Sequence, residues 1–336
     1  MFSTTLGKAK GWLVPAVGIL IVCNLFTIRA FTAQAGVGEL PKRLQDFLTL
    51  TTSVIVESLP FVILGIVLSA VVQLWLPESF IANRLPKRPL LRRACISFLG
   101  VALPVCECGN VPLARGLMVR GFSVPESLTF LLAAPILNPI TIITTHQAFG
   151  ADNSILAARL IGGFAIANIV GWLFSKHPHP EDILNPKFAA TCNVPDKHNH
   201  TTVGRRRQSL ELFVRETSNI MPALFIGAAV AGLVQTLVPR EVLMTLGSNP
   251  VWSIAAMMAL AFIVSICSNV DAFFALAFNS TFTAGSLVSF LVFGPVIDIK
   301  MLSLMRTTYK VGALVQIAVI VALISALLGL VVNYAF

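Results

Sequence analysis

Charged residues are scarce in this chain: only 12% of its 336 residues are Asp, Glu, Lys or Arg. A soluble domain carries about 25% of these residues, so the composition excludes an ordinary soluble protein. Apolar residues replace them, making up 56% of the chain and giving a mean hydropathy of +0.84. The composition therefore predicts an integral membrane protein that lies in the lipid bilayer.

Two functional signatures are also missing. No Gly-x-x-x-x-Gly-Lys-Ser/Thr run occurs, so the sequence contains no P-loop for a nucleotide, and we expect neither a cofactor nor an enzyme activity. The six cysteines follow no disulfide pattern of a secreted protein. The net charge of +9 lies in short loops beside apolar segments, where it indicates membrane topology and not nucleic-acid binding.

Apolar windows that meet the criterion of roughly 20 residues for a spanning helix occur at 12–28, 47–76, 127–145, 155–174, 222–238, 287–304 and 311–332. The first window follows Lys8 and Lys10 and resembles a signal peptide, but its length favours a retained helix. Two further apolar stretches, 94–121 and 250–284, contain polar runs.

These polar runs are the most informative local feature. Residues 104–112 read Pro-Val-Cys-Glu-Cys-Gly-Asn-Val-Pro, and residues 266–271 read Ile-Cys-Ser-Asn-Val-Asp. Polar groups at membrane depth are costly and indicate a functional site by default. Two such runs in matching positions of a chain are typical of a transporter built from two repeats.

Other residues support an internal repeat, because ordered Pro, Gly, Gln, Cys and Asn matches rarely arise from apolar composition alone. The matches recur at a nearly constant spacing: Pro60, Gly65, Gln73 and Pro77 with Pro222, Gly227, Gln235 and Pro239; Cys108, Asn110 and Val111 with Cys267, Asn269 and Val270; Pro135 and Asn138 with Pro295 and Asp298.

Loop charges then predict the orientation. Basic residues at 84–93 and 176–207 mark two cytoplasmic loops by the positive-inside rule. Both loops lie inside only if the stretch 94–121 dips into the membrane and returns to the same side. No Lys or Arg occurs between Arg240 and Lys300, as expected for a second hairpin that enters from outside.

The predicted fold is an all-α polytopic inner-membrane protein with an inverted repeat. Each half has three spanning helices and one re-entrant helical hairpin, and one extra N-terminal helix precedes them. The N-terminus is cytoplasmic and the C-terminus outside. The segments are 1–45 (extra helix and outer loop), 46–175 (first repeat), 176–206 (cytoplasmic linker) and 207–336 (second repeat).

The linker contains four prolines and little apolar material, which predicts a flexible segment. Its His177, His179, His198, His200 and Cys192 would either capture a metal ion or simply belong to a polar linker.

The hairpin tips have predictable local geometry. Gly109 permits a turn, Asn110 caps the returning half-helix, and Pro112 suits its first turn. In the second hairpin, Ser268 or Asn269 is the expected cap, with Asp271 in the first turn.

Both tips can meet near the membrane midplane, which would bring Cys106 and Cys108 close to Cys267. Thiolates suit soft metals and trivalent arsenic, so a three-sulfur substrate site is one hypothesis, with Cys106 and Cys108 as metal ligands. The alternative is that these small residues only permit close packing. Asn110 and Asn269 are further substrate-binding candidates beside the thiols.

The remaining polar residues have two interpretations each. Glu107, Asp271 and Glu57 are candidates for proton coupling. Alternatively, Glu107 reaches a basic partner such as Arg115, and Glu57 lies at a helix end near the outer interface. Asn138 and Asp298 either line the pathway or bind backbone groups freed by nearby prolines. Lys300, Arg306 and Lys310 are expected to snorkel to the cytoplasmic interface, whereas Arg159 lies one turn inside a spanning segment.

The run at 104–117, Pro-Val-Cys-Glu-Cys-Gly-Asn-Val-Pro-Leu-Ala-Arg-Gly-Leu, and the run Ala-Pro-Ile-Leu-Asn-Pro at 134–139 resemble the ArsP-like family of predicted permeases. The resemblance covers the chain from about residue 45. It implies an inner-membrane permease, with some members linked to efflux of trivalent organoarsenicals and others to copper or zinc. It also implies that Cys106 and Cys108 are thiol ligands. The linker lacks a dense His/Cys cluster, which argues against the copper and zinc branch.

Our leading hypothesis is efflux of a soft, thiol-reactive small molecule or ion by alternating access, either coupled to an ion gradient or uncoupled. One alternative is a transporter of a small anion held by helix N-termini. Another is a membrane thiol oxidoreductase that uses Cys106 and Cys108. The oligomeric state stays open.

Overall fold

The computed structural model describes residues 41–75, 85–103, 105–150, 153–192, 202–237 and 250–335. Within these ranges the chain is helical, and the β-structure consists of an isolated bridge between Leu184 and Tyr309. The predicted all-α class is therefore confirmed. The predicted first helix at 12–28 and the linker residues His198 and His200 lie outside the described residues.

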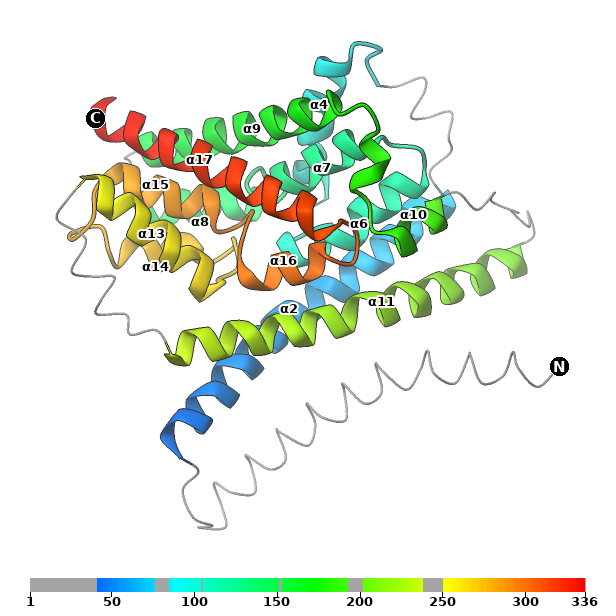
Figure 1. Cartoon of the computed structure of the whole chain (residues 1–336), viewed down its shortest axis with the longest axis horizontal. Coiled ribbons are helices and arrows are strands. Elements are labelled where there is room, and N and C mark those ends of the chain that lie inside the picture. Colours follow the sequence, from blue (N-terminus) through cyan, green and yellow to red (C-terminus); the bar gives the residue numbers. More distant parts are fainter. Residues whose placement is uncertain are drawn as a thin grey trace.

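Among the residues that the structure describes, four long helices are apolar enough to cross a membrane, and we therefore treat the chain as an integral membrane protein. They are α2 (Lys42–Trp75), α9 (Asn153–Ser175), α11 (Thr202–Leu237) and α17 (Val311–Ala335). α2 and α11 pack against each other on one side of the bundle, and α9 and α17 pack together on the other side (Figure 1). Side chains such as Ile226 and Leu323 are exposed on these helices, as expected for a surface that faces lipid.

Shorter helices fill the space between these long ones. They are α4 (Pro89–Ser97), α5 (Leu99–Ala102), α6 (Glu107–Val119), α7 (Val124–Ala133), α8 (Pro139–Phe149), α13 (Pro250–Val264), α14 (Asp271–Leu276), α15 (Ala284–Phe293) and α16 (Ile299–Met305). Every residue of α7 is buried, and so is every residue of α15 after the first. These two helices therefore form the centre of the core.

The predicted spanning segments 127–145 and 287–304 are not single helices. The first is divided between α7 and α8, and the second between α15 and α16. The Asn138 side chain caps α8 by accepting from Ile140 N at 3.0 Å, and Asp298 caps α16 by accepting from Met301 N. A proline at the start of α8 favours this break because it lacks an N–H and fits the first turn.

Both polar runs lie at helix interruptions, one between α5 and α6 and the other between α13 and α14. The predicted caps are wrong. α6 begins directly after Cys106, so Asn110 and Pro112 lie inside the helix. In the second run Val270 precedes α14, so neither Ser268 nor Asn269 is the cap residue. α6 begins before Asn110, whereas α14 begins after Asn269. In both cases tertiary contacts, described below, fix the backbone that precedes the helix. Asp271 in the first turn of α14 is confirmed.

The described part of the linker is folded, which corrects the prediction of flexibility. It forms the 3-10 turn η1 (Pro180–Ile183) and the helix α10 (Pro186–Cys192). Phe188 and Ile183 are buried, and these two apolar side chains anchor a segment that is otherwise polar. The backbone continues the attachment, because Asn185 N donates to Thr308 O and Lys310 N donates to Ile183 O, both at 2.8 Å.

A metal site in the linker is not supported by its described residues. His177 and His179 are exposed, and burial raises the pKa of the Cys192 thiol, which disfavours the thiolate that binds metals. Among the residues that the structure describes, the cluster of potential metal ligands is Cys106, Glu107 and Cys108.

α2 and α6 approach each other closely at two glycines, and this contact fixes the position of the first polar run. A Cβ on Gly65 would meet the backbone of Gly109, and one on Gly109 would meet the Phe61 carbonyl and the Val105 side chain. Gly109 therefore serves helix packing rather than the predicted turn. The absence of side chains lets the backbone of α6 lie directly against α2.

Gly65→Ala is expected to lower the free energy of unfolding by about 1–3 kcal/mol, the usual effect of overpacking. Gly312→Ala in α17 is the matched control, since a Cβ there meets nothing within 4 Å. The control should be neutral or stabilising by up to about 1 kcal/mol. Thermal unfolding of the purified protein in detergent measures both. Equal stability of the two variants would contradict the close approach.

Candidate functional site

Three buried thiols lie together where the two polar runs meet. Cys106 and Cys108 are at the beginning of α6, and Cys267 lies in the stretch between α13 and α14. The Cys106 thiol is in hydrogen-bonding contact with the thiols of both Cys108 and Cys267. All three are free thiols. The structure thus brings together the three cysteines that the sequence singled out.

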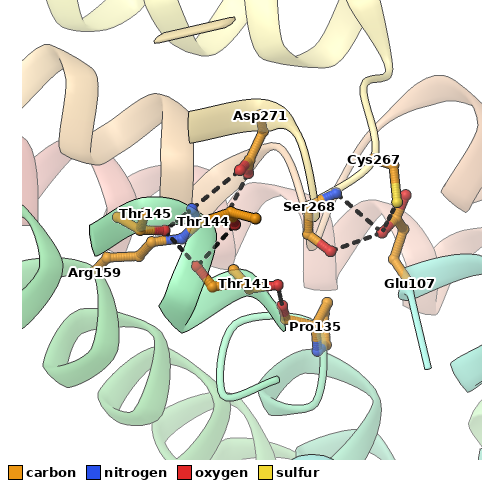
Figure 2. Close-up of polar contacts among 9 residues, drawn as sticks. All are labelled: Glu107, Pro135, Thr141, Thr144, Thr145, Arg159, Cys267, Ser268 and Asp271. Carbon is orange, nitrogen blue, oxygen red and sulfur yellow. Dashed lines mark hydrogen bonds and ion pairs between the residues drawn. The ribbon is translucent and has the colours of Figure 1, made fainter. Parts of the chain in front are cut away.

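Glu107 connects the first polar run to the second (Figure 2). Its Oε2 accepts hydrogen bonds from Ser268 N at 3.3 Å, from Ser268 Oγ at 3.0 Å and from the Cys267 thiol at 3.5 Å. Its Oε1 pairs with the Lys300 ammonium at 3.2 Å. The carboxylate therefore holds together two segments that are far apart in the chain.

Lys300 is the basic partner of Glu107, and the predicted partner Arg115 is wrong. The predicted position of Lys300 at the cytoplasmic interface is also wrong, because its side chain is buried and 1% exposed. Its Nζ donates to Ser265 O at 3.4 Å as well. Ser265 has a left-handed backbone with φ 51°, which costs about 1–2 kcal/mol in a residue with a Cβ. One feature of the sequence distinguished Lys300 from other basic residues. It is the first Lys or Arg after Arg240.

A second buried ion pair joins α9 to α14 beside the thiols (Figure 2). Arg159 binds Asp271 through two contacts, Nη1 to Oδ1 at 3.0 Å and Nη2 to Oδ2 at 2.6 Å. Arg159 Nη1 also donates to Thr145 Oγ1 at 2.7 Å. Arg159 and Asp271 are 0% and 2% exposed. Asp271 thus has a fixed positive partner that the sequence did not identify.

Arg115 connects the C-terminal half of α6 to α11, to the residues after α16 and to α10. Its Nε pairs with Glu216 of α11 at 2.8 Å, and its Nη1 donates to Thr307 O at 2.9 Å. Its guanidinium lies 4.2 Å from the centre of the Phe188 ring in α10. The helix that bears Cys106 and Cys108 is therefore connected to the folded part of the linker.

Two of the predicted polar residues support the thiols rather than joining them. Asn110 Nδ2 and Asn138 Nδ2 both donate to the Val105 carbonyl, at 3.4 and 3.3 Å. They hold the backbone directly before Cys106. Asn138 therefore binds a backbone carbonyl of the first polar run, whereas the carbonyl of nearby Pro135 accepts from Thr141 Oγ1.

The other predicted residues lie around this cluster. Asp298 is a helix cap, and its buried Oδ2 has no hydrogen-bond partner; the same is true of Asn269 Oδ1. Glu57 is half-buried in the middle of α2, so the predicted helix-end position is wrong. It lies within electrostatic range of Lys300 and Glu107.

Broken apolar helices that enclose free thiols and ion pairs define a polytopic membrane protein with a buried polar centre, an arrangement found in permeases. The ArsP-like model of predicted permeases matches residues 43–334. The chain belongs to this permease family, as the resemblance of its Cys-Glu-Cys run implied.

Two curated relatives match this chain over most of their length. The UPF0718 protein YcgR of Bacillus subtilis is 37% identical over 281 residues, which cover 82% of this chain and 94% of that protein. A Streptococcus mutans protein named as a putative two-component membrane permease complex subunit is 32% identical, covering 83% of this chain and 92% of that protein. No solved structure matches the chain.

The Arg159–Asp271 pair generates a stability prediction. Arg159→Met alone leaves a buried carboxylate without its partner and should lower the free energy of unfolding by about 3–5 kcal/mol. Combining it with Asp271→Leu removes both buried charges and should recover most of that loss.

A double-mutant cycle on thermal unfolding in detergent tests this pairing. Arg306→Met is the control, since Arg306 is exposed, and it should change stability little. Additive losses from Arg159→Met and Asp271→Leu would contradict direct coupling between the two side chains.

Proposed function

We propose that this permease exports a soft, thiol-reactive solute by alternating access, and that Cys106, Cys108 and Cys267 bind the solute. The observation that carries the proposal is a cluster of three buried free thiols from two separate parts of the chain, in which Cys106 contacts both Cys108 and Cys267. A site between two segments can open when the segments move apart. Sulfur ligands also select soft metals and trivalent arsenicals over hard ions.

A trivalent arsenical would bind by exchange of its oxygen ligands for sulfur. For each thiol, an arsenic–sulfur bond forms, an arsenic–oxygen bond breaks, and the thiol proton leaves with the hydroxyl as water. The exchange needs no oxidant or reductant and leaves the net charge unchanged. A neutral exchange suits a site that is enclosed among apolar helices, where a new unpaired charge is costly.

We propose further that the chain is an inverted repeat with two re-entrant hairpins. α7 and α15 begin at Val124 and Ala284, and α8 and α16 begin at Pro139 and Ile299. The same sequence separation therefore relates α7 to α15 and α8 to α16. Their caps correspond as well, with Ser123 matching Thr283 and Asn138 matching Asp298. The interruptions before α6 and before α14 would be the two hairpin tips, reached from the cytoplasm and from outside. In this topology the C-terminus lies outside the inner membrane.

Transport of a small anion is less well supported. The Ser268 amide, which would attract an anion, already binds the carboxylate of Glu107. Asp271 adds a second carboxylate in the first turn of α14. Protein carboxylates therefore take the place that a free anion would need, so we favour binding through the thiols.

Replacement of the thiols tests the proposed substrate. Cys106→Ser, Cys108→Ser and Cys267→Ser are each expected to reduce uptake of arsenous acid, which has three exchangeable hydroxyls, into everted vesicles at least about tenfold, since even a residue that only supports a ligand is commonly worth that much. Cys95→Ser is the matched control because Cys95 is exposed and lies outside the cluster. Wild-type uptake by all three cluster variants would overturn the thiol role.

Cysteine labelling tests the topology independently. In a background without other accessible cysteines, Lys87→Cys and Ser123→Cys flank the first hairpin, and Ser280→Cys follows the second. All three positions are exposed. An impermeant maleimide should label the first two from the cytoplasmic side and the third from outside. Labelling of Lys87→Cys and Ser123→Cys from opposite sides would rule out a re-entrant first hairpin.

A further inference from the structure

We propose that the ammonium of Lys300 is a built-in substitute for a coupling cation. It occupies an oxygen-lined position where a transporter of this kind would hold Na⁺, so export proceeds without Na⁺ or K⁺. The inference rests on the proposed transport function, but its main test measures cation binding and not transport.

The first observation is the set of oxygens around the ammonium. Lys300 Nζ lies 3.2 Å from Glu107 Oε1 and 3.4 Å from the carbonyl oxygen of Ser265. A carboxylate and a backbone carbonyl are ligands that proteins offer to hard cations. Because Lys300 is 1% exposed and Glu107 is also fully enclosed, bulk water does not supply the charge compensation of this carboxylate.

The second observation is the place of the Ser265 carbonyl in the fold. It follows the end of α13 (Pro250–Val264), where a helix carries partial negative charge on its last carbonyls. The left-handed backbone of Ser265 ends the helix there. The preceding carbonyl of Val264 accepts from Gln235 Nε2 at 3.0 Å. In transporters with broken helices, such carboxyl ends and unwound carbonyls coordinate the coupling cation.

The third observation is a difference between the two halves of the chain. At the spacing that relates α7 to α15, Ser265 corresponds to Val105, whose carbonyl is bound by the neutral amides of Asn110 and Asn138. The same spacing matches Lys300 with Ile140. The first half therefore satisfies this carbonyl with two dipoles, whereas the second half uses a full positive charge.

A tethered cation has a functional consequence. It cannot leave with the solute, so it contributes no free energy from an ion gradient. Its positive charge balances the negative charge of the Glu107 carboxylate, while that carboxylate accepts hydrogen bonds from Ser268 and Cys267. Its presence also excludes a mobile cation, because two positive charges would compete for the same oxygens.

Lys300→Ala tests the inference, because it removes a propylammonium group and leaves the oxygens. The purified full-length chain is compared in detergent at equal ionic strength in NaCl, KCl, choline chloride and propylammonium chloride. The wild-type midpoint of thermal unfolding should be the same in all four. The midpoint of Lys300→Ala should be lowest in choline and rise by about 2–4 °C with Na⁺, K⁺ or propylammonium.

Lys300→Arg is the matched control, since its guanidinium keeps a positive charge at the same oxygens and therefore still excludes a mobile cation. Its midpoint should not respond to the choice of cation. The inference is overturned if Lys300→Ala responds to none of the small cations, or if the wild-type midpoint rises with Na⁺ or K⁺.

A transport measurement keeps the inference testable should Lys300→Ala fail to fold. Uptake of arsenous acid into wild-type everted vesicles should be unchanged when choline replaces Na⁺ and K⁺. Uptake that requires either ion would refute the built-in cation while leaving the thiol site intact. Loss of the thiol dependence, in contrast, would refute the proposed function and leave the thermal result standing.

Discussion

The whole bundle depends on one constraint: polar groups enclosed among apolar helices must find their partners inside the protein. Glu107 meets this constraint for two segments at once, because its two oxygens bind the second polar run and Lys300. The meeting of the three thiols follows from that contact. Cys106 and Cys108 flank Glu107 in the sequence, and Cys267 directly precedes Ser268. A ligand that draws on these thiols must therefore act on the contact that joins the two halves.

Features with a local physical cause were predictable from the sequence. Hydropathy over a window of membrane-spanning length identified the membrane class, because burial of an apolar run in lipid needs no knowledge of its neighbours. The placement of Asp271 in a first helical turn was equally local. The grouping of Cys106, Cys108 and Cys267 was also anticipated, since two polar runs in matching sequence positions were expected to meet.

The charged partners were not predictable, because pairing depends on residues far apart in the chain. Lys300 follows an apolar window, so its sequence position fits a snorkelling side chain as well as a buried one. Only the folded structure places it beside Glu107, 193 residues away. The docked linker was missed for a similar reason. One Phe188 in a polar segment carries little signal until the buried guanidinium of Arg115 is known to lie against it.

The ion pairs Arg159–Asp271 and Lys300–Glu107 differ in chemistry, and this difference separates their roles. Arg159 binds Asp271 through two parallel contacts. A planar guanidinium fixes the orientation of a carboxylate in addition to neutralising its charge. Lys300 offers a point charge on a flexible stem, shared between Glu107 and a backbone carbonyl. A point charge can follow a carboxylate that shifts, whereas a bidentate pair resists rotation. The Arg159–Asp271 pair therefore fixes the orientation of the second polar run, whereas the Lys300 contact constrains the Glu107 carboxylate less tightly.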